Sequence, residues 1–452
     1  MYYKNKMELK NKKVLLMGLG ILGGGVATAR WLVEQGAILT VTDMKNEEIL
    51  KPSLEKLKDL EGKARFVLGR HEEKDFLDND IIVVNPDVPA DNKFVELARK
   101  AGKQIENELT LFFSHLKSKN VVAITGTRGK TTTTNWTAHF LKMHNVDTFL
   151  VGNSPEKPFL QEIKNINENS LVVLEVPSYH LEIVNGKNFK PHVAVITNLY
   201  RDHINRHKTM EEYASAKANI FKGQNEDDFL ILNKENEWTD FFFGLKPKSQ
   251  VIFYDVQDNF SPEETEEFLK KWGEHNLLNL FASASAALAM GVSVEEIKTH
   301  ISTLPQIKFR QEKVFENENL AIFNDTTATS PEASMAAMER FATMNENLIF
   351  IAGGTDRDLE FKKWAEVVEK NIKPEQLILL SGSATEKMKK ELGWDSFNEF
   401  ETLKECLNKA LEIAKGQDKS NIVFSPGAKS FEKFKNEFDR GEKFNLLVKE
   451  TL

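Results

Sequence analysis

The stretch "AITGTRGKTTTTNWTAHFLK" (Ala123 to Lys142) decides the centre of the fold. It opens as a short apolar strand, turns through Gly126 and Gly129, and continues as a helix. Glycines allow a loop whose main-chain N–H groups point inward, and the helix N-terminus that follows favours an anion. Lys130 can reach phosphate groups there, and the Thr131 hydroxyl can ligate Mg²⁺. The alternative is a threonine-capped helix with a solvated lysine, but Gly-Lys-Thr directly after an apolar strand favours nucleotide binding.

The loop is a compact variant of the usual phosphate-binding pattern. That pattern places a glycine five residues before Gly129, where this chain has Ile124. The string here is T-G-T-x-G-K-T. By itself it indicates a phosphate site and not a reaction.

A second glycine-rich turn, "GLGILGGG", follows the first apolar strand of the chain. It contains Gly18-x-Gly20-x-x-Gly23, and Asp43 ends the next strand. This pattern suits a dinucleotide, any other nucleotide diphosphate, or only a tight turn with close helix packing. Two phosphate-binding turns in one chain favour an enzyme that handles two phosphorylated compounds.

Composition narrows the class of protein. The chain has 452 residues, 41% hydrophobic and 28% charged, which predicts a globular protein of about three domains. A net charge of −8 argues against a nucleic-acid partner, and no apolar run is long enough to cross a membrane. The single Cys406 excludes a disulfide framework, and the polar start lacks a signal-peptide pattern. We expect a soluble, cytoplasmic protein and a monomer.

Strand and helix patterns alternate along the whole chain, which predicts α/β architecture with parallel sheets. The expected domains are a Rossmann-like N-terminal domain (1–110), a central P-loop-type ATPase domain (111–305) and a Rossmann-like C-terminal domain (306–452). Pro305 interrupts a helical pattern and marks a linker. The third domain begins with an expected hairpin that turns at Glu316 to Asn319.

Polar residues stand where central strands end. Glu175 ends "SLVVLEV", and Asp202 and His203 follow "HVAVITN"; Lys217 lies on the next helix. Taken singly, these could be a helix cap, a core histidine and a solvated lysine. Together with the Thr131 hydroxyl they could complete an Mg²⁺–ATP site, because hard oxygen ligands suit Mg²⁺.

The order of these segments resembles the Mur ligase family of ATP-dependent enzymes that form the amide bonds of the peptidoglycan stem peptide. The resemblance covers nearly the whole chain and is carried by these stretches: "GTRGKTTT", "LEVPSYHLE", "ITNLYRDHINRH", "EEYASAKANIF", "GEHNLLNLFASASAAL", "FRQEKV", "FNDTTATSPEA" and "FSPGAKSFEKFKNEFDRG". The "GLGILG" turn and "FKNEFDRG" favour the member that adds glutamate over its sister ligases.

The resemblance implies a role for each matched residue. ATP is expected on Gly126, Thr127, Gly129, Lys130, Thr131, Thr132, Asn279, Arg310 and Asp325, with Asn279 at the adenine. Two Mg²⁺ ions are expected on Thr131, Glu175, His203 and a carbamylated Lys217, and Lys130, His203 and Lys217 are the expected catalytic residues. The UDP-sugar is expected on Gly18, Gly20, Ile21, Leu22, Gly23, Asp43 and Asn153, and the amino acid on Thr329, Arg357, Ser430 and Phe431.

The implied reaction phosphorylates the alanyl carboxylate of UDP-N-acetylmuramoyl-L-alanine and then transfers the acyl group to the amine of D-glutamate. L-glutamate, or another acidic amino acid, is the closest alternative. A folate polyglutamate ligase would not explain the first glycine turn. An NAD-dependent oxidoreductase would use Gly18, Gly23 and Asp43 but leave Lys130 and Glu175 unexplained, and a non-catalytic scaffold would explain none of them.

Departures from the family pattern gather near the amino-acid and diphosphate sites. Thr327 stands where a lysine is usual, Arg357 replaces another lysine, and Glu437 aligns with an aromatic residue. Asp87 lies in a turn expected to face an anion, Pro177 replaces a serine, and Arg128 replaces an asparagine. None of these positions is Lys130, Glu175, His203 or Lys217, so ATP activation is expected to be intact while the choice of amino acid is less constrained.

Overall fold

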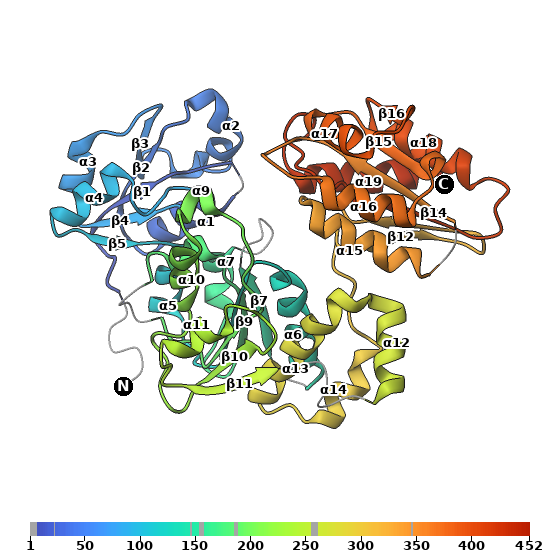
Figure 1. Ribbon diagram of the computed structural model, residues 1–452. Coiled ribbons are helices and arrows are strands. Elements are labelled where there is room, and N and C mark those ends of the chain that lie inside the picture. Colours follow the sequence, from blue (N-terminus) through green and yellow to red (C-terminus); the bar gives the residue numbers. More distant parts are fainter. Residues whose placement is uncertain are drawn as a thin grey trace. The chain divides into compact units, whose positions relative to one another are not determined.

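The computed structural model describes residues 7–21, 23–144, 147–152, 158–184, 189–254, 261–344 and 347–452. It contains three sheets in two compact units (Figure 1). One unit comprises Met1–Ser261 with Asn276–Leu304 and holds two sheets; the other comprises Pro262–His275 with Pro305–Leu452 and holds the third. Short 3-10 turns occur at Lys58–Leu60, Ile163–Asn165, Glu274–Asn276 and Pro374–Gln376.

The first sheet is parallel with strand order β3-β2-β1-β4-β5. Its strands are β1 (Lys13–Met17), β2 (Ile38–Asp43), β3 (Ala64–Leu68), β4 (Ile81–Val84) and β5 (Gln104–Glu106). Helices α1 (Gly24–Glu34) and α2 (Glu47–Glu55) pack on one face, and α3 (Glu73–Asp78) and α4 (Lys93–Lys100) on the other. Successive β1 side chains alternate between these two cores, as a strand covered on both faces requires.

The second sheet is also parallel, in the order β11-β10-β9-β6-β8-β7. Its strands are β6 (Val121–Thr125), β7 (Thr148–Gly152), β8 (Leu171–Glu175), β9 (Val193–Ile196), β10 (Phe229–Asn233) and β11 (Gln250–Tyr254). Its helices are α5 (Glu108–His115), α6 (Lys130–Met143), α7 (Phe159–Glu162), α8 (Ser178–Leu181), α9 (Ile204–His207), α10 (Met210–Ala218), α11 (Thr239–Gly244), α13 (Leu277–Ala289) and α14 (Val294–Ile301). Buried side chains of α5 join the cores of the first and second sheets into one cluster, which explains why the two sheets form one unit.

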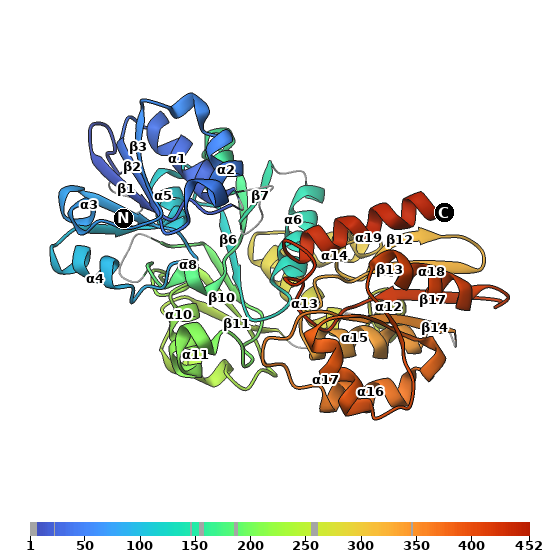
Figure 2. The ribbon, with the colours of Figure 1, turned by 90° about the horizontal axis from the view of Figure 1, so that it is seen from above.

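The third sheet has the order β12-β13-β17-β14-β15-β16, with an antiparallel β12–β13 hairpin and parallel pairs elsewhere. Its strands are β12 (Glu312–Glu316), β13 (Leu320–Asn324), β14 (Leu348–Gly353), β15 (Leu377–Leu380), β16 (Asn398–Phe400) and β17 (Ser420–Phe424). Helices α15 (Pro331–Ala342), α16 (Lys362–Asn371) and α17 (Ser383–Leu392) share a core on one face. Helices α18 (Leu403–Ala414) and α19 (Glu437–Thr451) share the core on the other, and α19 runs alongside β12 and β13 (Figure 2).

The expected α/β class with three Rossmann-like or P-loop-like parts is confirmed, including the hairpin that opens the third part. Helix α12 (Pro262–Trp272), which precedes α13 in the chain, belongs to the same unit as the third sheet. The boundaries 1–110, 111–305 and 306–452 remain predictions. Among the described residues, no helix is both long and apolar enough to cross a membrane.

Candidate active site

The loop after β6 is held in one shape by the neighbouring strand β9. Gly126 and Gly129 have φ angles of 151° and 79°, and a side chain at Gly126 would collide with Thr197. The Thr197 hydroxyl donates to the main-chain carbonyl of Arg128 at 2.6 Å, and the Arg128 N–H donates to Asn198 Oδ1 at 2.9 Å. The loop is therefore shaped before any ligand arrives.

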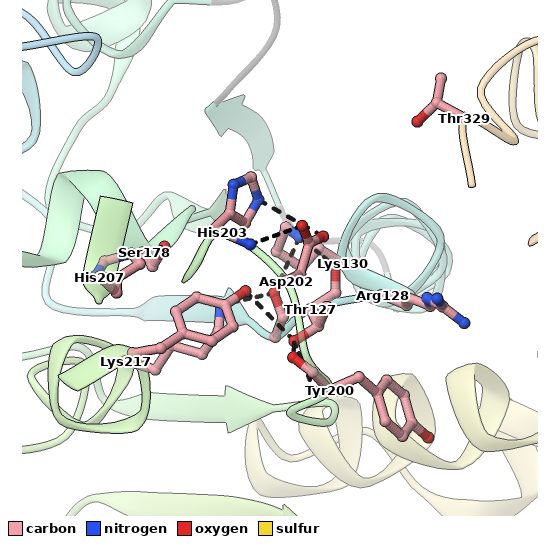
Figure 3. Close-up of polar contacts among 12 residues, drawn as sticks. Thr127, Arg128, Lys130, Ser178, Tyr200, Asp202, His203, His207, Lys217 and Thr329 are labelled. Carbon is pink, nitrogen blue, oxygen red and sulfur yellow. Dashed lines mark hydrogen bonds and ion pairs between the residues drawn. The ribbon is translucent and has the colours of Figure 1, made fainter. Parts of the chain in front are cut away.

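Lys130 is the first residue of α6 and folds back over this loop (Figure 3). Its Nζ donates to the carbonyl oxygens of Gly126 and Thr127, each at 3.0 Å. The Thr127 hydroxyl accepts the N–H of Tyr200 at 3.0 Å, which ties the loop to the segment after β9. All six predicted phosphate-binding residues between Gly126 and Thr132 thus lie in one loop and the first turn of its helix.

Asn279, predicted at the adenine, lies on α13 directly against this loop. A side chain at Gly129 would collide with its Oδ1, and the Thr133 hydroxyl lies 3.4 Å from the same oxygen. Its Nδ2 donates to Asn276 Oδ1 at 2.9 Å. The amide therefore packs under the glycine loop, where it fixes the approach of α13 to α6.

The carboxyl ends of β6, β8 and β9 bring the other predicted residues to the same edge of the sheet. Glu175 is the last residue of β8 and pairs in register with Ile124 of β6. Asp202 and His203 follow β9 and lie near Lys130 (Figure 3). Ligands of parallel α/β sheets bind at this edge, so sequence and topology agree on the position of the site.

His203 has a left-handed main chain, with φ 54°, at the start of α9. Its N–H donates to Asp202 Oδ1 at 2.7 Å, and its ring Nε2 lies 3.8 Å from Asp202 Oδ2. About half of each side chain is exposed. The imidazole is thus oriented by the preceding carboxylate and open to a ligand.

In the described part of the chain, no group of three His, Cys, Asp or Glu side chains is arranged to hold a metal. Mg²⁺ does not need such a cage, because it keeps several waters and usually takes one or two carboxylates together with substrate phosphates. Thr131 at the loop and Glu175 at the adjacent strand end offer such a donor set. The residues present therefore fit a nucleotide-bound Mg²⁺.

Lys217 is buried on α10, with 1% of its surface exposed. Its Nζ donates to the Gly126 carbonyl at 2.8 Å and lies 4.5 Å from the centre of the Tyr213 ring. Burial, and secondarily the charge of Lys130, hold the pKa of Lys217 well below its ordinary value, while Asp202 opposes the shift. A lowered pKa increases the fraction of the lysine side chain that is neutral at a given pH, and the neutral amine is the nucleophilic form.

Arg206 was not singled out from the sequence, although it lies within the quoted "HINRH". Its guanidinium forms a two-point ion pair with Glu182, at 2.7 and 2.9 Å. It also donates to the carbonyl oxygens of Pro86 and Val88, at 2.6 and 3.1 Å. Arg206 thereby fastens the loop after β4, which contains the exposed Asp87, to the second sheet.

The N-terminal glycine turn is braced by Asp43. Its Oδ2 accepts the N–H groups of Leu19 and Gly20, at 2.9 and 3.0 Å, and its Oδ1 accepts that of Lys45 at 2.8 Å. The carboxylate is buried, so these bonds shape the turn.

Gly18, Gly20 and Gly23 all have positive φ angles, and Ile21 is exposed. Leu22 and Asn153, also predicted here, lie outside the described residues.

In the other unit, Asp325 lies just after β13. The Ser425 hydroxyl donates to its Oδ2 at 2.7 Å, and the N–H of Gln311 donates to its Oδ1 at 3.1 Å. Burial raises the pKa of Asp325 to about 7, although these bonds and the charge of Arg310 oppose the shift. Asp325 thus holds the segment that carries Arg310.

The residues predicted to bind the amino acid come from loops after β13, β14 and β17. Thr329 follows β13 and accepts a hydrogen bond from Lys429. Arg357 follows β14, and its guanidinium lies 4.7 Å from the centre of the Phe431 ring. Ser430 is buried, and within the described part of the chain its hydroxyl has no hydrogen-bond partner. The structure brings all four predicted residues to the carboxyl edge of the third sheet.

The family departures in this unit also have defined surroundings. The Thr327 hydroxyl donates to the Phe309 carbonyl at 2.8 Å, so this side chain secures the segment before β12. The carbonyl of Glu437 accepts the Thr326 hydroxyl at 3.0 Å. Arg440, also missed from the sequence, is fully buried and donates to the carbonyl oxygens of Thr326, Ala428 and Lys429.

Comparison with known proteins identifies the family. The model of the Mur ligase middle domain matches residues 124–288, and that of the Mur ligase MurD-like N-terminal domain matches residues 12–107. The chain is also 34% identical to the UDP-N-acetylmuramoylalanine--D-glutamate ligase of Roseiflexus sp., over 98% of this chain and 99% of the relative. The chain belongs to the Mur ligase family.

Further relatives agree. The UDP-N-acetylmuramoylalanine--D-glutamate ligase of Caldicellulosiruptor bescii is 34% identical over 99% of both chains. One from Borreliella burgdorferi is 32% identical over 98% of both. Among solved structures, a UDP-N-acetylmuramoylalanyl-D-glutamyl-2,6-diaminopimelate--D-alanyl-D-alanyl ligase from Acinetobacter baumannii matches with a TM-score of 0.60. It is 16% identical over 91% of this chain and 90% of that chain, which supports the fold alone.

As a Mur ligase, the protein is an ATP-dependent ligase that forms carbon–nitrogen bonds in peptidoglycan synthesis. The oxidoreductase considered from the first glycine turn is therefore set aside.

Proposed function

We propose that this Mur ligase joins D-glutamate to UDP-N-acetylmuramoyl-L-alanine at the expense of ATP. The observation that carries the proposal is the 34% identity, over 98% of the chain, to the UDP-N-acetylmuramoylalanine--D-glutamate ligase of Roseiflexus sp.. The glycine loop at the start of α6, Glu175 at the end of β8 and the buried Lys217, which donates to the Gly126 carbonyl, support the proposal.

The reaction has two steps. The substrate carboxylate attacks the γ-phosphorus of ATP, so that a carboxyl-oxygen–phosphorus bond forms and the bond to ADP breaks. The glutamate amine then attacks the acyl carbon, gives up a proton, and phosphate leaves. Lys130 stands at the loop and can stabilise the negative charge that gathers on the phosphoryl oxygens.

Magnesium, held by Thr131 and Glu175 with His203 at a second ion, would supply further positive charge to the phosphates. We infer that Lys217 is carbamylated, and its buried surroundings support this inference. A neutral amine is the form that attacks CO2, and the lowered pKa of Lys217 favours that form. The resulting carbamate would be an anion beside Lys130 and could help to hold metal.

The test is phosphate release by the purified protein with ATP, Mg²⁺ and UDP-N-acetylmuramoyl-L-alanine, with each glutamate isomer in turn, and the product mass. Release with D-glutamate and a product heavier by one glutamyl residue is expected. Release with L-glutamate only would replace the proposed acceptor by its isomer. No release with either isomer would overturn the proposal.

A further inference from the structure

The loops that follow β13, β17 and β14 lie together at one edge of the third sheet. These strands are adjacent and parallel, so the three loops leave from the same edge. The loops after β13 and β14 lead to α15 and α16 on one face, whereas the loop after β17 leads to α19 on the other. Loops that diverge in this way open the ligand crevice of an α/β sheet.

Lys429 lies in the loop after β17, at this edge of the sheet, and is half-buried. Its Nζ donates to Thr329 Oγ1 at 3.1 Å, across from one loop to the next. Two main-chain hydrogen bonds with Thr355, at 2.8 and 3.1 Å, fix its position. The Thr329 loop (324–330) contains no basic residue of its own, so the positive charge beside Thr329 comes from Lys429.

Within the described residues, Lys429 forms no ion pair with an acidic side chain. The acidic residues next to its loop are engaged elsewhere, since Asp356 pairs with Lys387 and Glu432 accepts from Ser383. A partly desolvated ammonium without a counter-ion is unfavourable. A bound anion would supply the missing partner.

Two neighbours make this a built site. Ser430, next in the chain, is 2% exposed, and its hydroxyl has no hydrogen-bond partner among the residues that the structure describes. Arg357, a second cation, lies over the Phe431 ring, and hydroxyl, ammonium and guanidinium groups together suit carboxylates.

We propose that Lys429 binds one of the two carboxylates of the incoming acidic amino acid, next to Thr329 and Ser430. The inference rests on the proposed function and adds a residue that recognises the acceptor amino acid. Arg357 is the partner for the other carboxylate.

The test varies glutamate at saturating ATP and UDP-N-acetylmuramoyl-L-alanine. Loss of one charged hydrogen bond corresponds to roughly 10- to 100-fold in affinity, so Lys429→Met should raise the KM for glutamate by about that factor. The KM for ATP should not change, and Lys429→Arg should recover most of the affinity. Lys435→Ala, which changes an exposed lysine on the same segment, is the matched control.

The preference for glutamate over its amides distinguishes recognition of a carboxylate from a merely structural role of Lys429. The unaltered protein should prefer glutamate to glutamine and to isoglutamine, and Lys429→Met should lose its preference over one of the two amides. An unchanged KM for glutamate, or an equal loss on all three acceptors, would overturn the proposal.

Calorimetric binding of glutamate in the presence of a non-hydrolysable ATP analogue separates the two proposals. One outcome is that glutamate binds the unaltered protein but not Lys429→Met, while the activity assay detects no phosphate release. That outcome would contradict the proposed function and support the Lys429 site. If phosphate is released and Lys429→Met binds glutamate as well as the unaltered protein does, the proposed function is supported and the Lys429 site is contradicted. Absence of glutamate binding in both proteins would overturn the site.

Discussion

At the scale of single residues, two lysines share one acceptor. Lys130 and Lys217 both donate to the Gly126 carbonyl, at 3.0 and 2.8 Å, from different helices. Two like charges at one oxygen repel each other, and Lys217 is the more deeply buried, so its pKa falls. One amine can therefore remain a cation for phosphate while the other is available as a neutral group.

Lys130→Ala should lower ligase turnover by roughly 10²- to 10³-fold or more, because a positive charge at the transferred phosphoryl group is lost. The fold should survive, since Lys130 contacts its own loop and not the core. Phosphate release and a thermal melt measure the two effects, with Lys142→Ala at the exposed end of the same helix as the control. Turnover within a few-fold of the unaltered enzyme would refute the role.

Lys217→Ala should also lose activity, and short carboxylates such as formate or acetate should restore part of it, because they can replace the carbamate anion. The measurement is turnover against added carboxylate, with the same additions to Lys130→Ala as the control. If no carboxylate restores any activity to the Lys217 variant alone, carbamylation loses its support.

At the scale of elements, Arg206 couples α9 to the loop after β4. Its guanidinium pairs with Glu182 and also donates to the carbonyl oxygens of Pro86 and Val88. These two residues precede Arg206 by more than 100 positions in the sequence. The exposed Asp87 lies between those two carbonyl groups in the chain. The shape of this loop therefore depends on a residue of the second sheet.

Arg206→Ala should free the segment 85–91, because two main-chain acceptors lose a charged donor. Hydrogen exchange of its amides should become faster, and the KM for the UDP-sugar should rise while that for ATP stays the same. Arg201→Ala changes an exposed arginine close by in the chain and serves as the control. Unaltered exchange in 85–91 would contradict the coupling.

At the scale of the whole molecule, the core that joins the first two sheets contains a buried acid. Glu108, the first residue of α5, is 8% exposed, and no described residue forms a hydrogen bond with its Oε1. Burial raises its pKa from 4.5 to about 7, against hydrogen bonds from the main chain of Leu160 and Phe159. The folded protein thus keeps a proton that the unfolded chain releases above pH 4.5.

The contribution of Glu108 to the stability should therefore fall as the pH rises from about 4.5 to about 7 and level off above that, since the folded state keeps the proton on this carboxyl in that window. The full effect of Glu108 is of the order of 3 kcal/mol. Urea unfolding at pH 5, 6, 7 and 8 for the protein and for Glu108→Gln isolates it. The free energy of unfolding of Glu108→Gln, relative to that of the unaltered protein, should increase as the pH rises to 7. A difference that does not change with pH would count against the buried acid.

Local sequence was enough for much of the fold. The strands β6, β8 and β9 are short, almost wholly apolar runs followed by polar residues, and such runs are readily predicted as buried parallel strands. The strands β5 and β16 have three residues each, too few to show a pattern, and the sequence did not reveal them.

What the sequence by itself determined is the glycine loop after β6 and the lysine that folds back over it, because Gly126, Gly129 and Lys130 lie within five residues of one another. The tertiary structure alone decided the roles of Arg206, Lys429 and Arg440. Their partners lie 120, 100 and 114 positions away, at Pro86, Thr329 and Thr326. Only the packing of strands into sheets brings such residues together, and no periodicity in a single chain records it.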